Sequence, residues 1–168
     1  MERTLPSIVR LVAHAPHRTV FTRFIPAANA SEARGMWREY YRKWENVTRD
    51  RLPPEILNLV PDLRKFVPPA SVIDRTVYSA FGGGTLLDFL SEHHIDTLIV
   101  SGGETDVCVL STVLSAVDLG YRIMLVEGAL CSSSDESHDA IIGLYRQRFN
   151  IQIGVANLEQ ILELWQPE

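Results

Sequence analysis

Apolar and polar residues alternate along this chain with two different periods, which predict helices and strands in turn. Apolar residues recur at helical spacing from Leu5 to Val12, and residues 18–24 (RTVFTRF) then fit a short strand. Residues 71–74 predict a second short strand, and residues 85–93 predict another helix. The first half therefore alternates between helix and strand.

The second half continues this alternation with shorter connections. Residues 97–101 (TLIVS) and 122–127 (RIMLVE) are nearly all apolar, which is typical of strands buried on both faces of a parallel sheet. A helix is predicted between them from about 107 to 119, with Gly120 as its C-terminal cap. The remaining predicted elements are a helix from 134 to about 149, a strand over 151–155 and a helix over 158–165. The pattern indicates an α/β fold of three layers, with helices on both faces of a mostly parallel central sheet.

Residues 31–69 interrupt the alternation. Residues 31–50 are rich in aromatic and charged side chains, and residues 52–69 contain five prolines, so this stretch is interpreted as an excursion over the surface. Four aromatic residues in it have the spacing of one helical stripe: Trp37, Tyr40, Tyr41 and Trp44. Such a stripe faces the core or another subunit, or it covers a ligand site as a lid.

Composition narrows the class of protein. A chain of 168 residues that is 46% hydrophobic can bury one sizeable core, so residues 1–168 are expected to form a single domain. A net charge of −5 gives no electrostatic basis for binding nucleic acid or an acidic membrane. Without a long apolar run or the apolar core of a signal peptide, a soluble cytoplasmic protein is expected, with a small molecule as partner.

Cys108 is the first candidate for chemistry. Ligands bind at the carboxyl ends of the strands in an open parallel sheet, and the turn SGGETDVCV follows the predicted strand 97–101 there. A thiol near a helix N-terminus is favoured as thiolate, its nucleophilic form. The alternative is a small residue that packs the helix against the sheet, as we interpret Cys131, the other cysteine.

Three ordered segments around Cys108 resemble the isochorismatase-like cysteine hydrolase family. GGETDVCVLSTVLSAVDLGYRIMLVEGA resembles the family block G-x-x-T-x-x-C-V, which continues with threonine, a small residue and aspartate and then G-Y. VIDRTVYSAFGGGTLLDFL lies upstream and resembles the Y-S-A-F stretch, and SSSDESHDA lies downstream. The resemblance covers residues 72–140 and implies a Rossmann-like fold. It also implies hydrolysis of an amide, ester or vinyl-ether type bond in a small molecule.

The resemblance also implies a site. The family uses aspartate, lysine and cysteine, and the cysteine, here Cys108, attacks a carbonyl-type carbon to give a thioester-like intermediate. Backbone amides of Cys108 and Glu104 would form the oxyanion hole, with a cis peptide bond between Gly103 and Glu104. We expect three aromatic residues in the pocket, Tyr78, Phe81 and Trp37. A homo-oligomer, dimer or tetramer, is implied as well.

Two departures from the family pattern affect the expected activity. Arg75 occupies the lysine position three residues before Tyr78, and arginine keeps the charge but does not readily shuttle a proton. Asp74 is no substitute acid, because adjacent strand residues point to opposite faces. The family's aspartate ends a first strand that has no counterpart in residues 1–168. The domain is therefore expected to lack a central strand and to expose a hydrophobic seam.

Two hypotheses of different class follow. The first is a cysteine hydrolase with Cys108 as nucleophile and Arg75 as its cationic neighbour, which requires an acid from upstream or from another chain. The second is a catalytically impaired family member that acts as a binding or assembly subunit. The family branch that acts on nicotinamide binds a metal through D-x-H after the second strand, where this chain reads TRFIPAANA. No metal or other cofactor is therefore indicated, and His138 is interpreted as a residue that caps or orients a helix.

Overall fold

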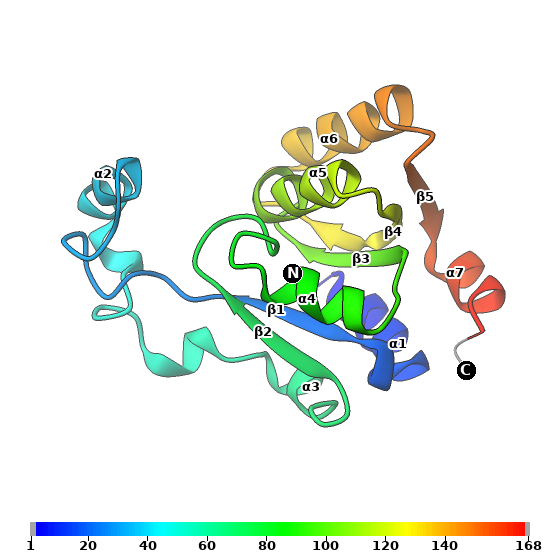
Figure 1. Ribbon diagram of the computed structural model, residues 1–168, viewed down its shortest axis with the longest axis horizontal. Coiled ribbons are helices and arrows are strands. Elements are labelled where there is room, and N and C mark those ends of the chain that lie inside the picture. The colour runs from blue at the N-terminus through cyan, green and yellow to red at the C-terminus, as the bar shows by residue number, and fades with distance from the viewer. Residues whose placement is uncertain (1–2, 167–168) are drawn as a thin grey trace.

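The strands of the computed structural model, which describes residues 3–166, form two parallel sheets (Figure 1). In the first, β1 (Val20–Phe24) pairs with β2 (Ser71–Arg75). In the second, β3 (Thr97–Gly103), β4 (Arg122–Cys131) and β5 (Ile153–Asn157) pair in that order. The helices between them are α1 (Leu5–His14), α2 (Met36–Lys43), α3 (Pro61–Arg64), α4 (Thr85–Glu92), α5 (Leu110–Asp118), α6 (Asp135–Arg148) and α7 (Leu158–Leu164). The predicted α/β class is confirmed.

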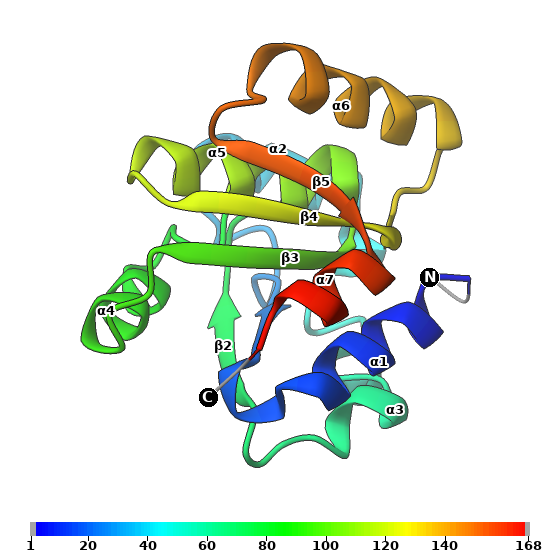
Figure 2. The same ribbon diagram turned by 90° about the vertical axis from the view of Figure 1, so that its right-hand side faces the viewer.

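Both sheets contribute to the same two apolar layers. Val20 and Ile73 of the first sheet belong to one layer with Leu125 of the second, under α4, α5 and α6. Phe21 and Val126 belong to the other layer, under α1 and α7. Figure 2 shows α5 and α6 on one side of the three-stranded sheet and α1 and α7 toward the other. The two sheets therefore have common faces, as two parts of one three-layer sandwich would.

β1 and β3 each have one edge without ladder hydrogen bonds among the described residues, since β1 pairs only with β2 and β3 only with β4. Ile99 and Val100 of β3 are only half-buried, whereas Leu125 and Val126 of β4 are fully buried. Unpaired N–H and C=O groups on an apolar strand form a template for a further strand. The single sheet that the sequence predicted is therefore divided.

Several boundaries differ from those predicted, because local geometry overrides the apolar pattern. β4 continues to Cys131 with an irregular register opposite Val100 and Gly102, and Gly128 has a φ of 80° there. β5 begins only at Ile153, since Ile151 is 92% exposed.

Within residues 3–166, no helix is long and apolar enough to cross a membrane.

The excursion between β1 and β2 carries α2 away from the sheets, as Figure 1 shows. The predicted stripe is correct for three residues, since Tyr41 is buried and Trp37 and Tyr40 are half-buried. It is wrong for Trp44, which is 46% exposed. Trp44 follows the last residue of α2 with non-helical angles of −116° and 53°, so its side chain leaves the stripe.

Substituting Leu125 by alanine tests the shared core. Its side chain is fully buried, so Leu125→Ala should lower the free energy of unfolding by about 3 kcal/mol. Urea unfolding followed by circular dichroism measures the change. Ile151→Ala is the control, with a shift below about 0.5 kcal/mol because Ile151 is exposed. Equal effects of the two substitutions would contradict this packing.

Candidate active site

Cys108 lies on a turn at the carboxyl end of β3. The strand ends at Gly103, and the peptide bond from Gly103 to Glu104 is cis, at the position that the resemblance indicates. A π-helical turn over Thr105–Val109 then leads into α5, and Cys108 is half-buried within it. A side chain at position 103 would approach Cys131 Sγ to 3.1 Å. Glycine therefore fits best where β3 passes Cys131, since any larger residue would have to displace it by a few tenths of an ångström.

The segment that follows β2 is attached to the helix that follows β3. Ser79 Oγ donates to Ser115 Oγ at 2.9 Å, and the Ala80 N–H donates to Thr112 Oγ1 at 3.0 Å. Thr112 lies one helical turn after Cys108. These bonds hold the segment that contains Tyr78 against the first turns of α5. The pKa of Tyr78 is raised mainly by burial and then by the charges of Tyr40, Cys108 and Tyr41.

Arg75 is a buried cation at the carboxyl end of β2. It is 8% exposed, its Nη1 donates to the Val77 carbonyl oxygen at 2.7 Å, and its guanidinium lies 5.4 Å from the centre of the Phe24 ring. Its Nε has no hydrogen-bond partner, and no carboxylate within residues 3–166 forms an ion pair with it. A buried charge without a partner is costly, so this site favours an added anion.

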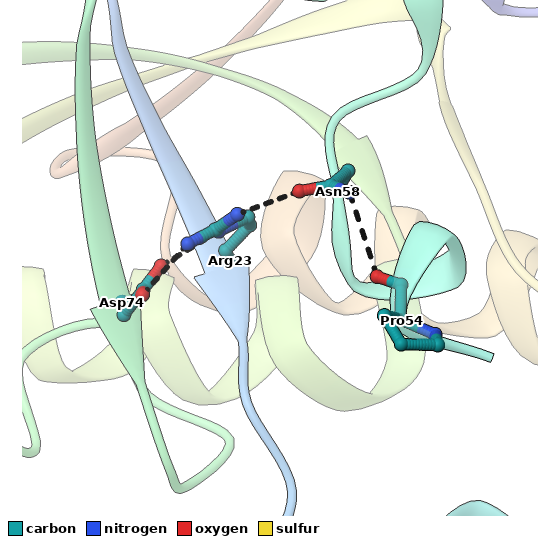
Figure 3. Close-up of polar contacts among 4 residues, drawn as sticks. All are labelled: Arg23, Pro54, Asn58 and Asp74. Atoms are coloured by element: carbon teal, nitrogen blue, oxygen red, sulfur yellow. Dashed lines mark hydrogen bonds and ion pairs between the residues drawn. The ribbon is translucent and has the colours of Figure 1, made fainter. Parts of the chain in front are cut away.

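Asp74 points away from Arg75, as strand alternation predicted. Figure 3 shows its carboxylate facing Arg23 of β1, which donates to it from Nε at 2.7 Å and from Nη2 at 2.8 Å. Arg23 Nη1 also donates to Asn58 Oδ1 at 3.4 Å, and Asn58 reaches the Pro54 carbonyl oxygen. The hydrogen bonds from Arg23 hold the pKa of Asp74 below its ordinary value. The ion pair of Asp74 with Arg23 therefore links β2 to β1, and Arg23 links both to the excursion. These contacts lie on the sheet face opposite to Arg75.

An aromatic group lies beside Tyr78. The Trp37 ring centre lies 4.8 Å from that of Tyr78 and 6.3 Å from that of Phe24, which in turn contacts the Arg75 guanidinium. α2 thus brings Trp37 over the carboxyl ends of β1 and β2. Phe81 is placed elsewhere, against Tyr121 at 5.9 Å in the core layer under α4 and α5. The structure brings together Trp37 and Tyr78 but not Phe81.

Sequence reasoning missed two features of the site. Phe24 received no role, although it is the register partner of Arg75 in the adjacent parallel strand, where side chains share a face. The links between α6 and the Cys108 turn were missed as well. Ser132 Oγ donates to Asp106 Oδ1 at 2.7 Å, and hydroxyls of Ser137 and Ser132 lower the pKa of Asp106.

Among residues 3–166, no group of three or more histidine, cysteine or acidic residues is placed to hold a metal ion.

The fold and the site define a three-layer α/β protein whose candidate site is built around a cysteine on a strand-to-helix turn. Comparison of the sequence with known protein families identifies the family to which the chain belongs. The Isochorismatase domain matches residues 1–157, and the chain therefore belongs to the isochorismatase family.

Relatives and solved structures agree with this assignment. The chain is 33% identical over 86 residues to the isochorismatase family protein PncA of Bacillus subtilis (strain 168), covering 51% of this chain and 47% of that protein. It is 41% identical over 58 residues to the nicotinamidase of Escherichia coli (strain K12), covering 32% of this chain and 27% of that protein. A crystal structure of an isochorismatase family protein from Desulfovibrio vulgaris matches with a TM-score of 0.79 at 22% identity, over 96% of this chain and 83% of that one. The matches to the two relatives thus span less than half of each relative's length.

Substituting Asp74 by asparagine tests the ion pair with Arg23. Its pKa in the folded chain lies below the ordinary 3.8, so its contribution is present above that value and is lost as pH falls through the folded pKa. Because both side chains are partly solvent-exposed, Asp74→Asn should cost at most about 1 kcal/mol at pH 7.

Urea unfolding of both proteins between pH 7 and about pH 2 measures this contribution. Wild type and Asp74→Asn should converge in acid. Asp62→Asn, which removes an exposed carboxylate 4.0 Å from Lys65, controls for the loss of one negative charge. A difference that stays constant down to the lowest pH would contradict the assigned role of Arg23.

Proposed function

We propose that this protein is a cysteine hydrolase that cleaves an amide, ester or vinyl-ether type bond of a small molecule, with Cys108 as nucleophile. The observation that supports the proposal is the attachment of the loop after β2 to α5, one helical turn after the half-buried Cys108, at the carboxyl ends of parallel strands. Ligands bind at this edge of an open α/β sheet. The nicotinamidase from E. coli among the relatives supports an amide as the bond type.

The chemistry assigns a role to each group. The Cys108 thiolate attacks the carbonyl-type carbon, and the oxygen takes up negative charge that the backbone N–H groups of Glu104 and Cys108 stabilise. In an amide or ester substrate the C–N or C–O bond then breaks, and the leaving group departs with the proton that the acceptor took from the Cys108 thiol. Water hydrolyses the thioester that remains, which releases the acid and restores the thiol.

The thiol proton needs an acceptor, and Arg75 does not supply one, since a guanidinium stays protonated. Arg75 instead acts as a buried cation that stabilises nearby negative charge. In this proposal the acceptor is a carboxylate at the end of a further strand that pairs with β1 or β3, each of which has an unpaired edge in the described residues. Another chain supplies it in this proposal.

The aromatic group forms the pocket wall in this proposal. Trp37 and Tyr78 lie 4.8 Å apart beside the Arg75 and Phe24 pair, and aromatic faces favour flat, apolar parts of a substrate. Phe81 contacts Tyr121, with ring centres 5.9 Å apart, and its place in this pocket stays a prediction. The substrate is expected to be a free small molecule in the cytoplasm.

A second candidate function is that of a binding or assembly subunit without catalysis. The observation that favours it is Arg75, which replaces the expected lysine and contacts no carboxylate within residues 3–166. The excursion also exposes large apolar side chains, among them Met36 at 78% and Ile56 at 63%. Such residues fit a contact between copies of this chain, so a homo-oligomer is expected under either function.

Alkylation of Cys108 tests the proposed nucleophile. In a Cys131→Ser background, Cys108 should react with iodoacetamide at pH 7 about tenfold faster than a free thiol such as glutathione, because thiolate is the reacting form. Intact mass followed over time gives the rate. Cys108→Ala is the matched control and should remain unmodified. Reaction no faster than glutathione would favour the binding subunit.

Removal of Trp37 tests the pocket wall. Because Trp37 packs on Tyr78 in the proposed pocket wall, Trp37→Ala should raise the rate of Cys108 labelling by a bulky maleimide about threefold or more relative to iodoacetamide. Trp44→Ala is the control, since Trp44 is exposed outside the aromatic group. Equal ratios in both variants would show that α2 does not cover the thiol.

A further inference from the structure

His138 contacts the turn that carries Cys108. It lies in the first turn of α6, where its backbone N–H donates to the Ser134 carbonyl oxygen. Its Nδ1 is hydrogen-bonded to Thr105 Oγ1 at 2.9 Å. Thr105 is fully buried, and a buried hydroxyl without a partner is costly. His138 is the side-chain partner that satisfies it.

Thr105 occupies the first position of the π-helical turn that contains Cys108. Its carbonyl oxygen accepts from the Leu110 N–H, so the same residue is held by its backbone on one side and by its hydroxyl on the other. The next residue, Asp106, is bonded through its side chain and its N–H to Ser132. The segment that begins α6 thus holds the turn from outside the β3 and α5 unit.

We propose that His138 is a positioning residue that holds the Cys108 turn, through Thr105, in the geometry that nucleophilic attack requires. This inference rests on the proposed function and extends it to a residue outside the reacting groups. A π-helical turn is much less common than an α-helical one, and here contacts from outside the turn hold it. Loss of the His138 contact should let the turn relax and move Cys108 Sγ away from the oxyanion donors.

The surroundings of His138 carry both signs of charge. Asp106 faces it from the turn. On the other side it lines a cavity of about 210 Å³ together with Glu127 of β4 and Asp139 and Arg146 of α6. Arg146 is paired with Glu127 at 2.8 Å. Because these charged neighbours also titrate, a pH effect alone does not identify His138. The substitutions that test the proposal therefore leave all of these neighbours in place.

The test uses matched pairs in the Cys131→Ser background. Thr105→Val removes the hydroxyl with little change of shape and Thr105→Ser keeps it. His138→Ala removes the contact, whereas His138→Asn keeps a polar atom near the Nδ1 position. Thr105→Val and His138→Ala should each lower the rate of Cys108 alkylation at pH 7 about tenfold and raise the pH midpoint of the rate by about one unit. Their combination should lower it no further.

The conservative variants and the control complete the test. Thr105→Ser and His138→Asn should recover the rate to within about threefold of wild type, and His94→Asn, at an exposed histidine, should not change it. Urea unfolding separates a loss of stability from a change at the thiol. Rates and midpoints equal to wild type in His138→Ala, or effects of the two substitutions that simply add, would overturn the proposal.

Failure of the proposed function gives a different result. If wild-type Cys108 is no more reactive than glutathione, the hydrolase proposal fails, whereas the backbone amide resonance of Cys108 still reports on the turn. That ¹H–¹⁵N resonance should move in Thr105→Val and His138→Ala and return toward the wild-type position in His138→Asn. An unmoved resonance in His138→Ala would overturn the positioning role independently of reactivity.

Discussion

The hydrogen bonds from the segment after β2 to α5 determine the geometry of the candidate site. β1 and β2 share no ladder hydrogen bond with β3, β4 and β5 among the described residues, so only apolar layers and a few side-chain contacts fix one sheet against the other. Ser79 and Ala80 reach Ser115 and Thr112 of α5. Since satisfied polar contacts specify one arrangement where apolar packing tolerates several, these part-buried bonds fix the segment that contains Tyr78 against α5.

Charge at the site is unbalanced in a way that bears on function. Strand alternation puts Asp74 and Arg75 on opposite faces, and the Arg23 ion pair holds Asp74 on its own face. Arg75 stays buried against Phe24 without a carboxylate in the described part of the chain. A cation in such surroundings raises the affinity for an anion, whether a catalytic carboxylate or an acidic group of the ligand. Which of these two anions Arg75 pairs with separates the hydrolase from the binding subunit.

Much of the fold followed from periodicity, because buried parallel strands such as 97–101 and 122–127 are almost wholly apolar. The position of Cys108 followed as well, since a strand-to-helix turn can be located from the same pattern. The division into two sheets did not follow from periodicity, which says nothing about pairing, and only the family resemblance pointed to a seam. Trp44 was misplaced because the direction of a side chain at a helix end depends on the local backbone angles. The contact of His138 with the Cys108 turn links residues 33 apart, which no local pattern reports.

Acylation of Cys108 by 4-nitrophenyl acetate tests directly whether Cys108 is the nucleophile of a hydrolase. The reaction is followed by intact mass in the Cys131→Ser background, with Cys108→Ala as control. The account predicts one acetyl adduct that requires Cys108, forms with release of nitrophenolate, and then disappears as water hydrolyses the thioester. Two results would contradict hydrolysis by this chain. Either no adduct forms, or the adduct is hydrolysed no faster than a simple thioester in water. Each would leave the binding subunit as its function.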